Sequence, residues 1–490
     1  MFPYRTIISL DRKSRQPLYL QLANQLIKLI KESKLPPRTK LLGSRQLAVL
    51  LKVHRKTIVA CYEELTLQGW VESLPKKGTY VHANLPLLNQ QDFSGVIPNV
   101  ERTNTGFTYY KNGYLKRNKS VANSAKMHLN DGISDLRLTP VNDLARIYRS
   151  IASKRNALDN LSYGSTYGVL PLREVLTEYL NKTRGLNSTK ATILITRGSQ
   201  MAIYLASQLL LKKGDVVIVG NTNYSAADST FEHYQAKLVR VPVDADGLDT
   251  NAIEALCKKQ AIKAIYVTSH HHHPTTVTLS AKRRIHLLNL AKAYNFAIIE
   301  DDYDYDFNYN HAPILPLASH DTNGNVIYIG SVCKTVAPVY RIGYLIAPKA
   351  FIDEAANLRR IIDRQGDALL ELTFAAFIKN GDLDRHIKKV MRIYKERRDL
   401  FCKLLQDELG AYFQFEIPKG GMAVWVILDK KYSWDRVDEI AKRNGLDIGD
   451  WRRYDLMKSD HNGIRMGFAS YTTDEIYALI TVLKKVIHAL

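Results

Sequence analysis

Ionisable side chains follow two apolar, strand-like segments in the second half of this 490-residue chain. The first segment, 296–300, ends in a group of acids that contains Asp301 and also Tyr303. The second segment, 326–330, leads to Lys334. Ligands of open α/β sheets bind just beyond the carboxyl ends of the strands. These three side chains are therefore expected to converge on one small molecule.

A buried carboxylate and a lysine that face one pocket suit pyridoxal 5′-phosphate (PLP). Its aldehyde needs a lysine amine for a Schiff base, which predicts that role for Lys334, and its ring nitrogen needs an anion such as Asp301. Its phosphate needs hydroxyl groups and a guanidinium, and Ser331 and Arg341 fit this requirement. The alternative is a surface lysine beside a solvated acidic turn. The order of these residues, each after an apolar strand, favours the cofactor site.

The sequence around these residues resembles a known family. Glu-Asp-Asp-Tyr-Asp at 300–304, Ser-Val-Cys-Lys-Thr at 331–335 and Arg-Ile-Gly-Tyr-Leu-Ile-Ala-Pro at 341–348 are similar to the cofactor site of fold-type I, aspartate-aminotransferase-like proteins. The first of these sequences, with the residues upstream, resembles the MocR/GabR branch of the GntR regulators. The resemblance implies an N-terminal winged helix-turn-helix. It also implies an α/β body with a mixed, mainly parallel sheet and a small C-terminal α+β subdomain.

The resemblance assigns roles to further residues of the predicted site. Ser199 and Gln200 open a helix after an apolar strand, and free N–H groups at such an N-terminus favour a phosphate. Tyr224 is implied to stack on the pyridine ring, with a core tyrosine as the alternative. His273 stands where related enzymes usually direct an Asn to the ring hydroxyl. Arg465 is implied to bind the carboxylate of an effector bidentately.

Four consecutive histidines, His270 to His273, invite a metal-binding hypothesis. Adjacent residues of an extended chain point to alternating sides and rarely supply one coordination sphere. The sequence therefore predicts no metal site here. The four cysteines are far apart and show no Cys-x-x-Cys spacing, so neither a disulfide framework nor a zinc site is predicted.

The N-terminal segment has the pattern of a winged helix. An amphipathic helix over 17–30, a short helix at 45–51 that Ser44 can cap, and a third helix over about 54–68 precede a hairpin with a basic tip. The second helix of a helix-turn-helix presents its N-terminal residues to the major groove. This geometry and the similarity to GntR-type domains together predict DNA contacts for Arg45, His54, Arg55, Lys56, Thr57, Lys77, Gly78 and Thr79. A three-helix protein-interaction module is the alternative, and the basic recognition helix disfavours it.

Charge is concentrated in the N-terminal quarter of the chain. The net charge is +21, with 15 lysines and arginines against 5 acids in residues 1–83 and 6 against 2 in residues 84–128. A basic head on a nearly balanced body favours a polyanion-binding module, although a solubilising surface has the same charge. We predict a winged-helix domain at 1–83, a linker at 84–128 and a PLP-binding, aminotransferase-like domain at 129–490.

Composition and length limit the class of protein. The chain is 46% hydrophobic and 24% charged, which is typical of globular proteins, and its length indicates two or more domains. It contains no apolar run of membrane-spanning length and begins without a signal-peptide pattern. The expected location is therefore the cytoplasm.

These features predict a transcriptional regulator. The winged helix binds operator DNA, and the PLP-bound body senses an amine, an amino acid or PLP itself through the internal aldimine at Lys334. Fold-type I bodies build their cofactor sites at a subunit interface, so the resemblance implies a head-to-tail homodimer. Two alternatives stay open: an active aminotransferase that carries a DNA-binding head, and a DNA-binding protein whose body has lost the cofactor. The sequence does not decide whether any transamination turnover occurs.

Overall fold

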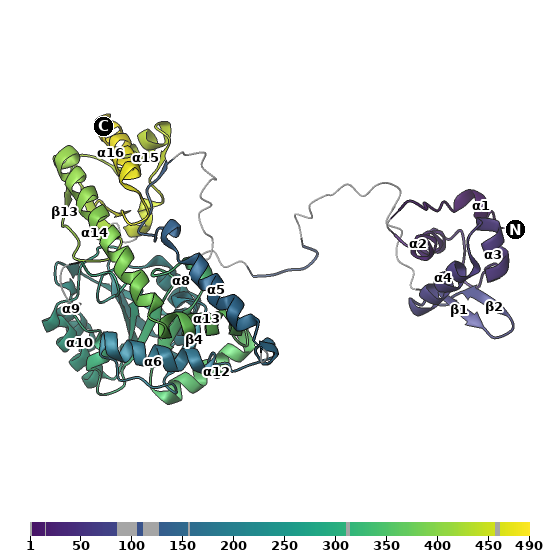
Figure 1. The fold of residues 1–490 in the computed structure, drawn as a ribbon, viewed down its shortest axis with the longest axis horizontal. Coiled ribbons are helices and arrows are strands. Elements are labelled where there is room, and N and C mark those ends of the chain that lie inside the picture. Colours follow the sequence, from purple (N-terminus) through teal and green to yellow (C-terminus); the bar gives the residue numbers. More distant parts are fainter. Residues whose placement is uncertain are drawn as a thin grey trace. The chain divides into compact units, whose positions relative to one another are not determined.

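The chain folds into two compact units, Met1–Tyr110 and Lys111–Leu490 (Figure 1). The computed structural model describes residues 2–14, 16–85, 105–110, 127–154, 157–309, 314–455 and 461–490. Most of the predicted linker, 84–128, lies outside the described residues. Its boundaries, and those of the domains on either side, stay predictions.

The N-terminal unit is a small helical domain with a two-stranded wing. Its elements are α1 (Tyr4–Ile7), α2 (Leu18–Lys31), α3 (Ser44–Leu51), α4 (Arg55–Leu67), β1 (Val71–Leu74) and β2 (Gly78–Val81). The apolar stripe of α2 packs into one core with Leu47 of α3 and Ile58 of α4. The wing is an antiparallel hairpin in which Leu74 pairs with Gly78. The predicted helix-turn-helix and hairpin are both present.

One predicted helix cap is wrong. Gly43 takes the N-cap position of α3 with an extended backbone, so Ser44 already lies in the first turn and caps nothing. Its hydroxyl instead accepts a hydrogen bond from Arg55 Nε at 3.3 Å, which links the two helices of the motif. At α4, the Nδ1 of His54 accepts a hydrogen bond from the backbone N–H of Lys56 at 3.1 Å and caps the helix.

The C-terminal unit is built on a seven-stranded sheet of order β4-β12-β11-β10-β9-β5-β6. Its strands are β4 (Ile193–Thr196), β5 (Val216–Gly220), β6 (Lys237–Val241), β9 (Ala264–Val267), β10 (Ala297–Asp302), β11 (Val326–Ser331) and β12 (Gly343–Ile346). Only β12 runs antiparallel to its neighbours. The predicted mixed, mainly parallel sheet is therefore confirmed.

Helices cover both faces of this sheet. They are α5 (Val141–Ala152), α6 (Leu170–Arg184), α7 (Ser199–Leu210), α8 (Ser225–His233), α9 (Thr250–Cys257), α10 (Ala281–Tyr294), α11 (Leu317–His320), α12 (Lys349–Ile362) and α13 (Ala368–Lys379). Side chains of a strand alternate between its faces. Ile193 and Ile195 of β4 pack with the core of α5, α6 and α13, whereas Leu194 packs with the core of α7, α8 and α12. This two-sided burial explains why the strands are apolar runs without alternation.

The acids that follow the first predicted strand in fact belong to it. Strand β10 pairs with β11 as far as Asp302 and Gly330, so the expectation that the strand stops at Glu300 is wrong by two residues. Pairing of Asp301 and Asp302 with β11 outweighs the low strand propensity of aspartate. The carboxylates at 300–302 are thus held by a rigid element rather than by a loop.

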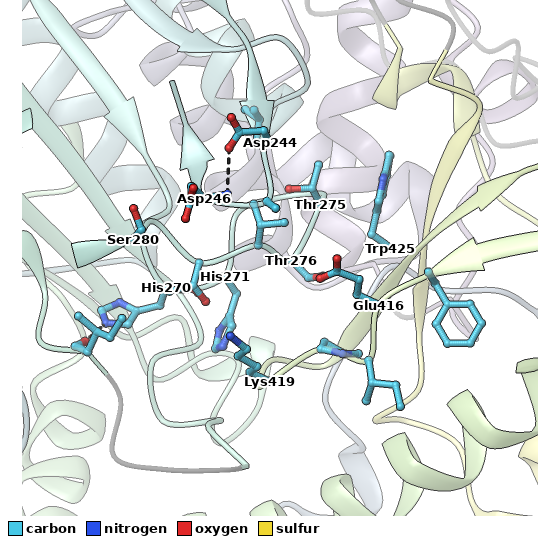
Figure 2. A pocket seen from close by; sticks show the side chains of 18 of the residues that line it. Asp244, Asp246, His270, His271, Thr275, Thr276, Ser280, Glu416, Lys419 and Trp425 are labelled. Carbon is cyan, nitrogen blue, oxygen red and sulfur yellow. Dashed lines mark hydrogen bonds between the residues drawn. The ribbon is translucent and has the colours of Figure 1, made fainter. Parts of the chain in front are cut away.

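A smaller α+β region follows the long helix α14 (Asp382–Leu409), as predicted. It contains an antiparallel sheet of order β13-β14-β16 and two helices, with bounds β13 (Phe413–Phe415), β14 (Ala423–Leu428), α15 (Trp434–Arg443), β16 (Gly463–Gly467) and α16 (Thr473–Ile487). Short pairs join β3 (Met127–His128) to β15 (Leu446–Asp447) and β7 (Val243–Asp244) to β8 (Gly247–Leu248). A cavity of about 780 Å³ lies between the small sheet and loops of the large one (Figure 2).

Candidate cofactor and effector site

Lys334 lies in a polar cluster that also contains Asp131, His273 and Arg465. Its Nζ donates a hydrogen bond to the carbonyl of Gly132 at 2.7 Å. The Nε2 of His273 is 4.0 Å from Oδ2 of Asp131, and Nε of Arg465 donates to the backbone carbonyl of Asp131 at 2.8 Å. Burial lowers the pKa of Lys334 from its ordinary value, although the nearby Asp131 acts in the opposite direction. A lysine with a lowered pKa has more neutral amine for attack on a carbonyl.

Arg465 is buried in this cluster and is fixed at each of its nitrogens. Besides the Asp131 contact, Nη1 donates to the carbonyl of Pro274 at 3.1 Å and Nη2 donates to the hydroxyl of Tyr303 at 3.3 Å. All three acceptors are neutral groups. The guanidinium thus keeps a positive charge without a direct carboxylate partner among the described residues, which suits the binding of a carboxylate.

Asp301 presents one oxygen that has no partner. Oδ2 accepts a hydrogen bond from the Tyr266 hydroxyl at 2.8 Å, whereas the buried Oδ1 has no hydrogen-bond partner among the described residues. Burial raises the pKa of Asp301 to about 7. A positive group placed at Oδ1 would offset this desolvation cost. The protonated ring nitrogen of PLP is such a group, so the carboxylate fits it.

Tyr224 and His273 place two rings beside each other on the same site. Their centroids are 5.2 Å apart and their planes are inclined by 70°. Burial and the charge of Arg465 lower the pKa of His273 well below its usual value, so its imidazole is neutral at pH 7. Its Nδ1 is buried without a partner. A neutral imidazole with a free nitrogen can exchange a hydrogen bond with a ring hydroxyl.

Arg341 and the start of α7 form a second part of the site. Gly198 precedes α7 with a φ of +77°, and a Cβ at this glycine would lie 2.6 Å from Nη2 of Arg341. Ser199 is the first residue of the helix, and Nη2 of Arg341 also donates to the carbonyl of Arg197 at 2.9 Å. The structure thus brings a guanidinium to a helix N-terminus, an arrangement that suits a phosphate.

Two predicted phosphate ligands make internal contacts instead. The hydroxyl of Ser331 donates to the carbonyl of Ile342 at 3.1 Å and accepts from the N–H of Cys333 at 3.0 Å. Gln200 donates from Nε2 to the Thr230 hydroxyl at 2.8 Å. Its Oε1 is buried without a partner. Both side chains therefore support the strand-to-helix connections around the site in this state.

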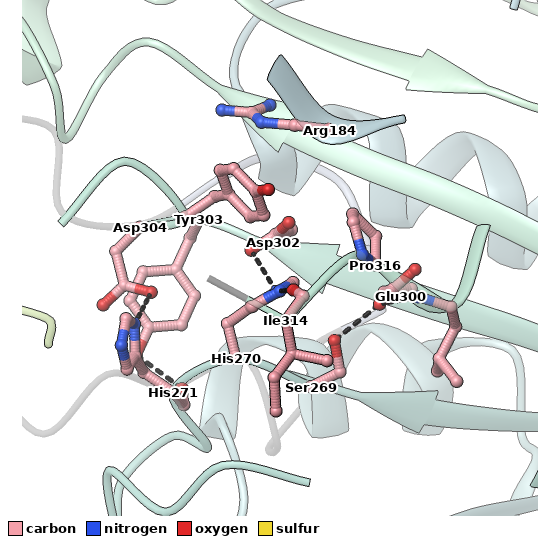
Figure 3. Close-up of polar contacts among 12 residues, drawn as sticks. Arg184, Ser269, His270, His271, Glu300, Asp302, Tyr303, Asp304, Ile314 and Pro316 are labelled. Atoms are coloured by element: carbon pink, nitrogen blue, oxygen red, sulfur yellow. Dashed lines mark hydrogen bonds and ion pairs between the residues drawn. The ribbon is translucent and has the colours of Figure 1, made fainter. Parts of the chain in front are cut away.

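The four consecutive histidines diverge to separate partners. Figure 3 shows His270 turned toward Asp302 and His271 toward Asp304, with Nδ1 to Oδ1 distances of 3.1 and 2.8 Å. His272 contacts the hydroxyl of Thr275 at 2.9 Å, and burial lowers its pKa to about 3. Within the described ranges, no group of three or more His, Cys, Asp or Glu is arranged to hold a metal.

Sequence reasoning missed two residues of this cluster. Nη2 of Arg453 donates to Oδ2 of Asp131 at 2.9 Å, and its guanidinium lies over the ring of Tyr454 at 4.8 Å from the centroid. Asp131 lies in a loop and Arg453 in a short 3-10 helix, Trp451–Tyr454, 322 positions further along the chain. Only the fold brings them together at the Lys334 cluster.

The predicted DNA contacts lie on one small part of the winged helix. Arg45, His54, Arg55 and Lys56 are exposed at the first turns of α3 and α4, and Thr57 is half-buried behind them. Lys77, Gly78 and Thr79 form the tip and first residues of the wing. Lys40, which was not named from the sequence, is also exposed. Its Nζ lies 5.7 Å from the ring centroid of Tyr80, beside the wing.

Comparison with known proteins explains this combination. The profile of the family "Aminotransferase class I and II" matches residues 129–483. The chain belongs to this family. Residues 18–81 also match the profile "Bacterial regulatory proteins, gntR family". An aminotransferase-family body behind a GntR domain fits the MocR/GabR type, as the sequence motifs predict.

Individual relatives are of two kinds. An uncharacterized HTH-type transcriptional regulator of Bacillus subtilis, YdfD, is 27% identical over 97% of this chain and 98% of its own length. Aromatic-amino-acid aminotransferase 1 of Thermococcus litoralis is 29% identical over 73% of this chain and 86% of its own. The crystal structure of Pyrococcus horikoshii kynurenine aminotransferase in complex with PMP superposes with a TM-score of 0.68 and 28% identity, covering 74% of this chain and 91% of that one.

The cofactor that this family membership implies is PLP. The residues present fit it. Lys334 supplies an amine, Asp301 a buried unpartnered oxygen, Tyr224 an aromatic face, and Arg341 a guanidinium at the N-terminus of α7. Each of these groups matches a different part of PLP.

Proposed function

We propose that this protein is a PLP-dependent transcriptional regulator in which the winged helix binds operator DNA and the aminotransferase-family body senses an amine or amino acid. One observation carries the proposal: a half-buried lysine and a buried carboxylate that suit PLP share a chain with an exposed basic helix-turn-helix. Relatives that match nearly the whole chain are named as regulators, which supports this combination. Such a protein would act in the cytoplasm.

The residues around Lys334 have distinct parts in sensing. PLP supplies a reversible reaction between its aldehyde and primary amines, and an electron sink. Lys334 offers its amine for that reaction, and Gly132 holds the amine in place by a hydrogen bond of 2.7 Å. When PLP is bound, Asp301 would keep the ring nitrogen protonated, and His273 would hold the ring hydroxyl. Tyr224 would cover one face of the ring and exclude water from it.

The effector would be recognised next to these groups. Arg465 binds the carboxylate of the effector. Its guanidinium then gives up hydrogen bonds to neutral oxygen atoms of the protein and forms hydrogen bonds with the carboxylate anion. The Asp131–Arg453 ion pair stands at the same cluster, with side-chain exposures of 31% and 38%. It is positioned to contact the remainder of the effector. An effector that binds one arrangement of the body more tightly than another shifts the equilibrium between them, and this shift changes operator affinity.

A second copy of the chain would complete the assembly as a head-to-tail homodimer. Several large apolar side chains of the body are exposed, namely Leu158 at 74%, Leu161 at 66%, Tyr163 at 78%, Val339 at 77% and Ile361 at 79%. Contact with a second copy would remove such side chains from water. The match to operator half-sites would follow from the twofold symmetry of such a dimer.

An active aminotransferase with a DNA-binding head is the less favoured function. The aminotransferase relatives match only the body, whereas regulators match the chain nearly end to end. Addition of amino acid and keto acid, with measurement of product over time, separates turnover from sensing.

The test is an absorbance spectrum of the purified protein with PLP, before and after borohydride, followed by peptide mapping. A visible band trapped on Lys334 is expected. Operator DNA can be selected from a random pool, and its affinity measured with and without candidate amino acids. A label on another lysine, or no band, would refute the proposed cofactor site. An operator affinity that no amine alters would refute sensing.

A further inference from the structure

The ion pair of Asp131 and Arg453 leaves one donor of the arginine without a partner. Nη2 of Arg453 donates to Oδ2 of Asp131 at 2.9 Å and to the hydroxyl of Tyr454 at 2.6 Å. Its Nε is buried and has no hydrogen-bond partner among the described residues. A buried donor without an acceptor is rare in native proteins, because nothing offsets its loss of hydration. The Nε of Arg453 therefore indicates a place for an acceptor from outside the chain.

The shape of the guanidinium indicates that this acceptor has two oxygens. Nε and one Nη of an arginine lie side by side and can bind a carboxylate with two parallel hydrogen bonds. Asp131 does not use this arrangement, since it meets Arg453 only at Nη2. A second carboxylate at Nε and Nη2 would satisfy the unpartnered donor and replace one of the two existing contacts of Nη2.

The second guanidinium of the cluster is held by the same aspartate. Arg465 donates from Nε to the backbone carbonyl of Asp131 at 2.8 Å, whereas Arg453 donates to the side chain of that residue. The carbonyl oxygen and a carboxylate oxygen of one aspartate are no more than about 6 Å apart, because only a few covalent bonds join them. Asp131 thus bridges the two arginines over the same span as the two ends of a short dicarboxylate.

The surroundings of this bridge favour anions. Burial by itself would raise the pKa of Asp131, yet the charge of Arg453 and of the other cations nearby outweighs burial and lowers the pKa from its ordinary value. A lowered carboxyl pKa indicates a positive potential at this point. The ring of Tyr454 lies 4.8 Å from the guanidinium of Arg453 and holds its plane in place. The arginine is therefore already oriented for a ligand.

We propose that Arg453 determines the class of effector and that this class is a dicarboxylic amino acid of the size of aspartate or glutamate. Arg465 binds one carboxylate, and Arg453 binds the other through Nε and Nη2. The amine then lies on the side of Lys334, whose Nζ is held by the residue that follows Asp131. This inference rests on the proposed function, because it names the effector of that same site.

The opposite preference, for an effector with a cationic side chain, would use Asp131 instead. The carboxylate of Asp131 already has a cation as its partner, whereas Nε of Arg453 has no acceptor. A cationic ligand would also leave the guanidinium of Arg453 without its only carboxylate among the described residues. Removing one member of an ion pair in this way is unfavourable for the charge that remains. The structure therefore favours the anionic ligand.

The probes are succinate and glutarate, which carry two carboxylates and no amine, so they take no part in Schiff-base chemistry. Binding to the full-length, PLP-loaded protein is measured by isothermal titration calorimetry at low salt. Butyrate has the carbon chain of succinate with a single carboxylate and serves as the comparison. The better-fitting dicarboxylate should bind about tenfold more tightly than butyrate, because it adds a bidentate contact with arginine.

Variants of Arg453 test which residue causes this preference. Arg453→Gln should reduce the preference to less than about twofold and leave the affinity for butyrate nearly unchanged, since Arg465 remains. Arg453→Lys keeps the charge without the paired N–H groups and should retain a preference of about threefold. The adjacent Arg452 is exposed and paired with Asp435, so Arg452→Gln is the matched control and should keep the full preference.

Three results would overturn the proposal. The first is equal affinity of the wild-type protein for the dicarboxylates and for butyrate. The second is a dicarboxylate preference that both Arg453→Gln and Arg453→Lys leave intact. The third is tighter binding of 4-(trimethylammonio)butyrate, an unreactive cation with one carboxylate, which would assign the subsite to Asp131. Uptake of PLP at Lys334 shows that each variant is folded, and Arg453→Lys decides the question if the glutamine variant takes up none.

Failure of this inference and failure of the proposed function give different results. L-glutamate and L-norvaline, which has the same carbon chain with an uncharged end, are added in turn to the operator-binding assay. If L-norvaline changes operator affinity as strongly as L-glutamate, the protein senses amino acids and the proposed class is wrong. If the dicarboxylates bind through Arg453 but no amino acid changes operator affinity, the subsite is correct and the proposed sensing is refuted.

Discussion

The two binding regions of this molecule are assembled in opposite ways. The DNA-binding surface is local: its predicted residues lie within 45–79, on two short helices and one hairpin. The Lys334 cluster gathers Asp131, His273, Lys334 and Arg465 from segments more than 300 residues apart. The first region depends on helix and turn preferences, the second on the register of a large sheet. Substitutions should therefore separate the two functions cleanly.

Lys334→Ala is expected to have the largest effect of any single change. It removes the amine that the site offers for covalent attachment, so borohydride should trap no cofactor at this site. Operator binding in the absence of effector should stay within about threefold of wild type, because phosphate and base contacts belong to the winged helix. The measurement is trapping by mass spectrometry beside a binding titration. Loss of operator binding as well would show that the two regions are not independent.

Arg55→Ala is expected to have the reverse pattern. Arg55 is exposed at the first turn of α4 and contacts Ser44 of the preceding helix. Loss of its charge should weaken operator binding about tenfold to a hundredfold and reduce the salt slope by about one. The cofactor spectrum should not change. Lys28→Ala, in α2 and paired with Glu32, is the control and should leave DNA affinity nearly unchanged, because Lys28 lies outside the helix-turn-helix and the wing.

Asp301→Asn is expected to change stability in a pH-dependent way. The pKa of this carboxyl rises from 3.8 in the unfolded chain to about 7 in the fold, because burial penalises its charge. The unfolded state loses its proton first, so wild-type stability falls as pH rises from about 4 to 7. The variant carries no such proton and lacks this decline.

The measurement is thermal unfolding of cofactor-free protein at several pH values. The Tm of the variant relative to wild type should increase by on the order of 5 °C between pH 4 and 7. Bound PLP should reduce the difference, since a ring cation beside Oδ1 offsets the burial cost. A Tm difference that is independent of pH would contradict the raised pKa.

The same contrast between local and distant contacts determines how much of the fold and of the site could be predicted from the sequence. The apolar runs at 296–300 and 326–330 predicted two sheet strands, and the order of Asp301 and Lys334 after them predicted the cofactor. Asp301 and Asp302 were placed outside the strand because aspartate seldom occurs in strands, whereas their pairing with β11 includes them. Asp131 and Arg453 could not be predicted together, since no local pattern links two segments so distant in the chain.

The roles of Ser331 and Ser44 show a second limit of sequence reasoning. A serine hydroxyl next to a predicted phosphate site suits phosphate binding, and one at a predicted helix start suits capping. The same hydroxyl can also form a hydrogen bond with any other polar group nearby. Ser331 is engaged by Ile342 and Cys333, and Ser44 by Arg55. Side-chain hydrogen bonds of serine depend on backbone positions accurate to about 1 Å, which the sequence does not specify.

Lys40→Ala is expected to have the smallest effect and to sharpen the contrast within the DNA-binding surface. Lys40 lies beside Gly78 of the wing, where a Cβ on the glycine would be 3.1 Å from its Cε, and over the ring of Tyr80. We expect its ammonium to meet a phosphate rather than a base edge. Removal should weaken binding to all sequences by about threefold and reduce the salt slope by about one, without altering base preference.

Arg55→Ala, by comparison, should relax preference at one base position. Binding selections with both variants would distinguish these effects. A changed base preference for Lys40→Ala would mean that the wing itself reads the sequence.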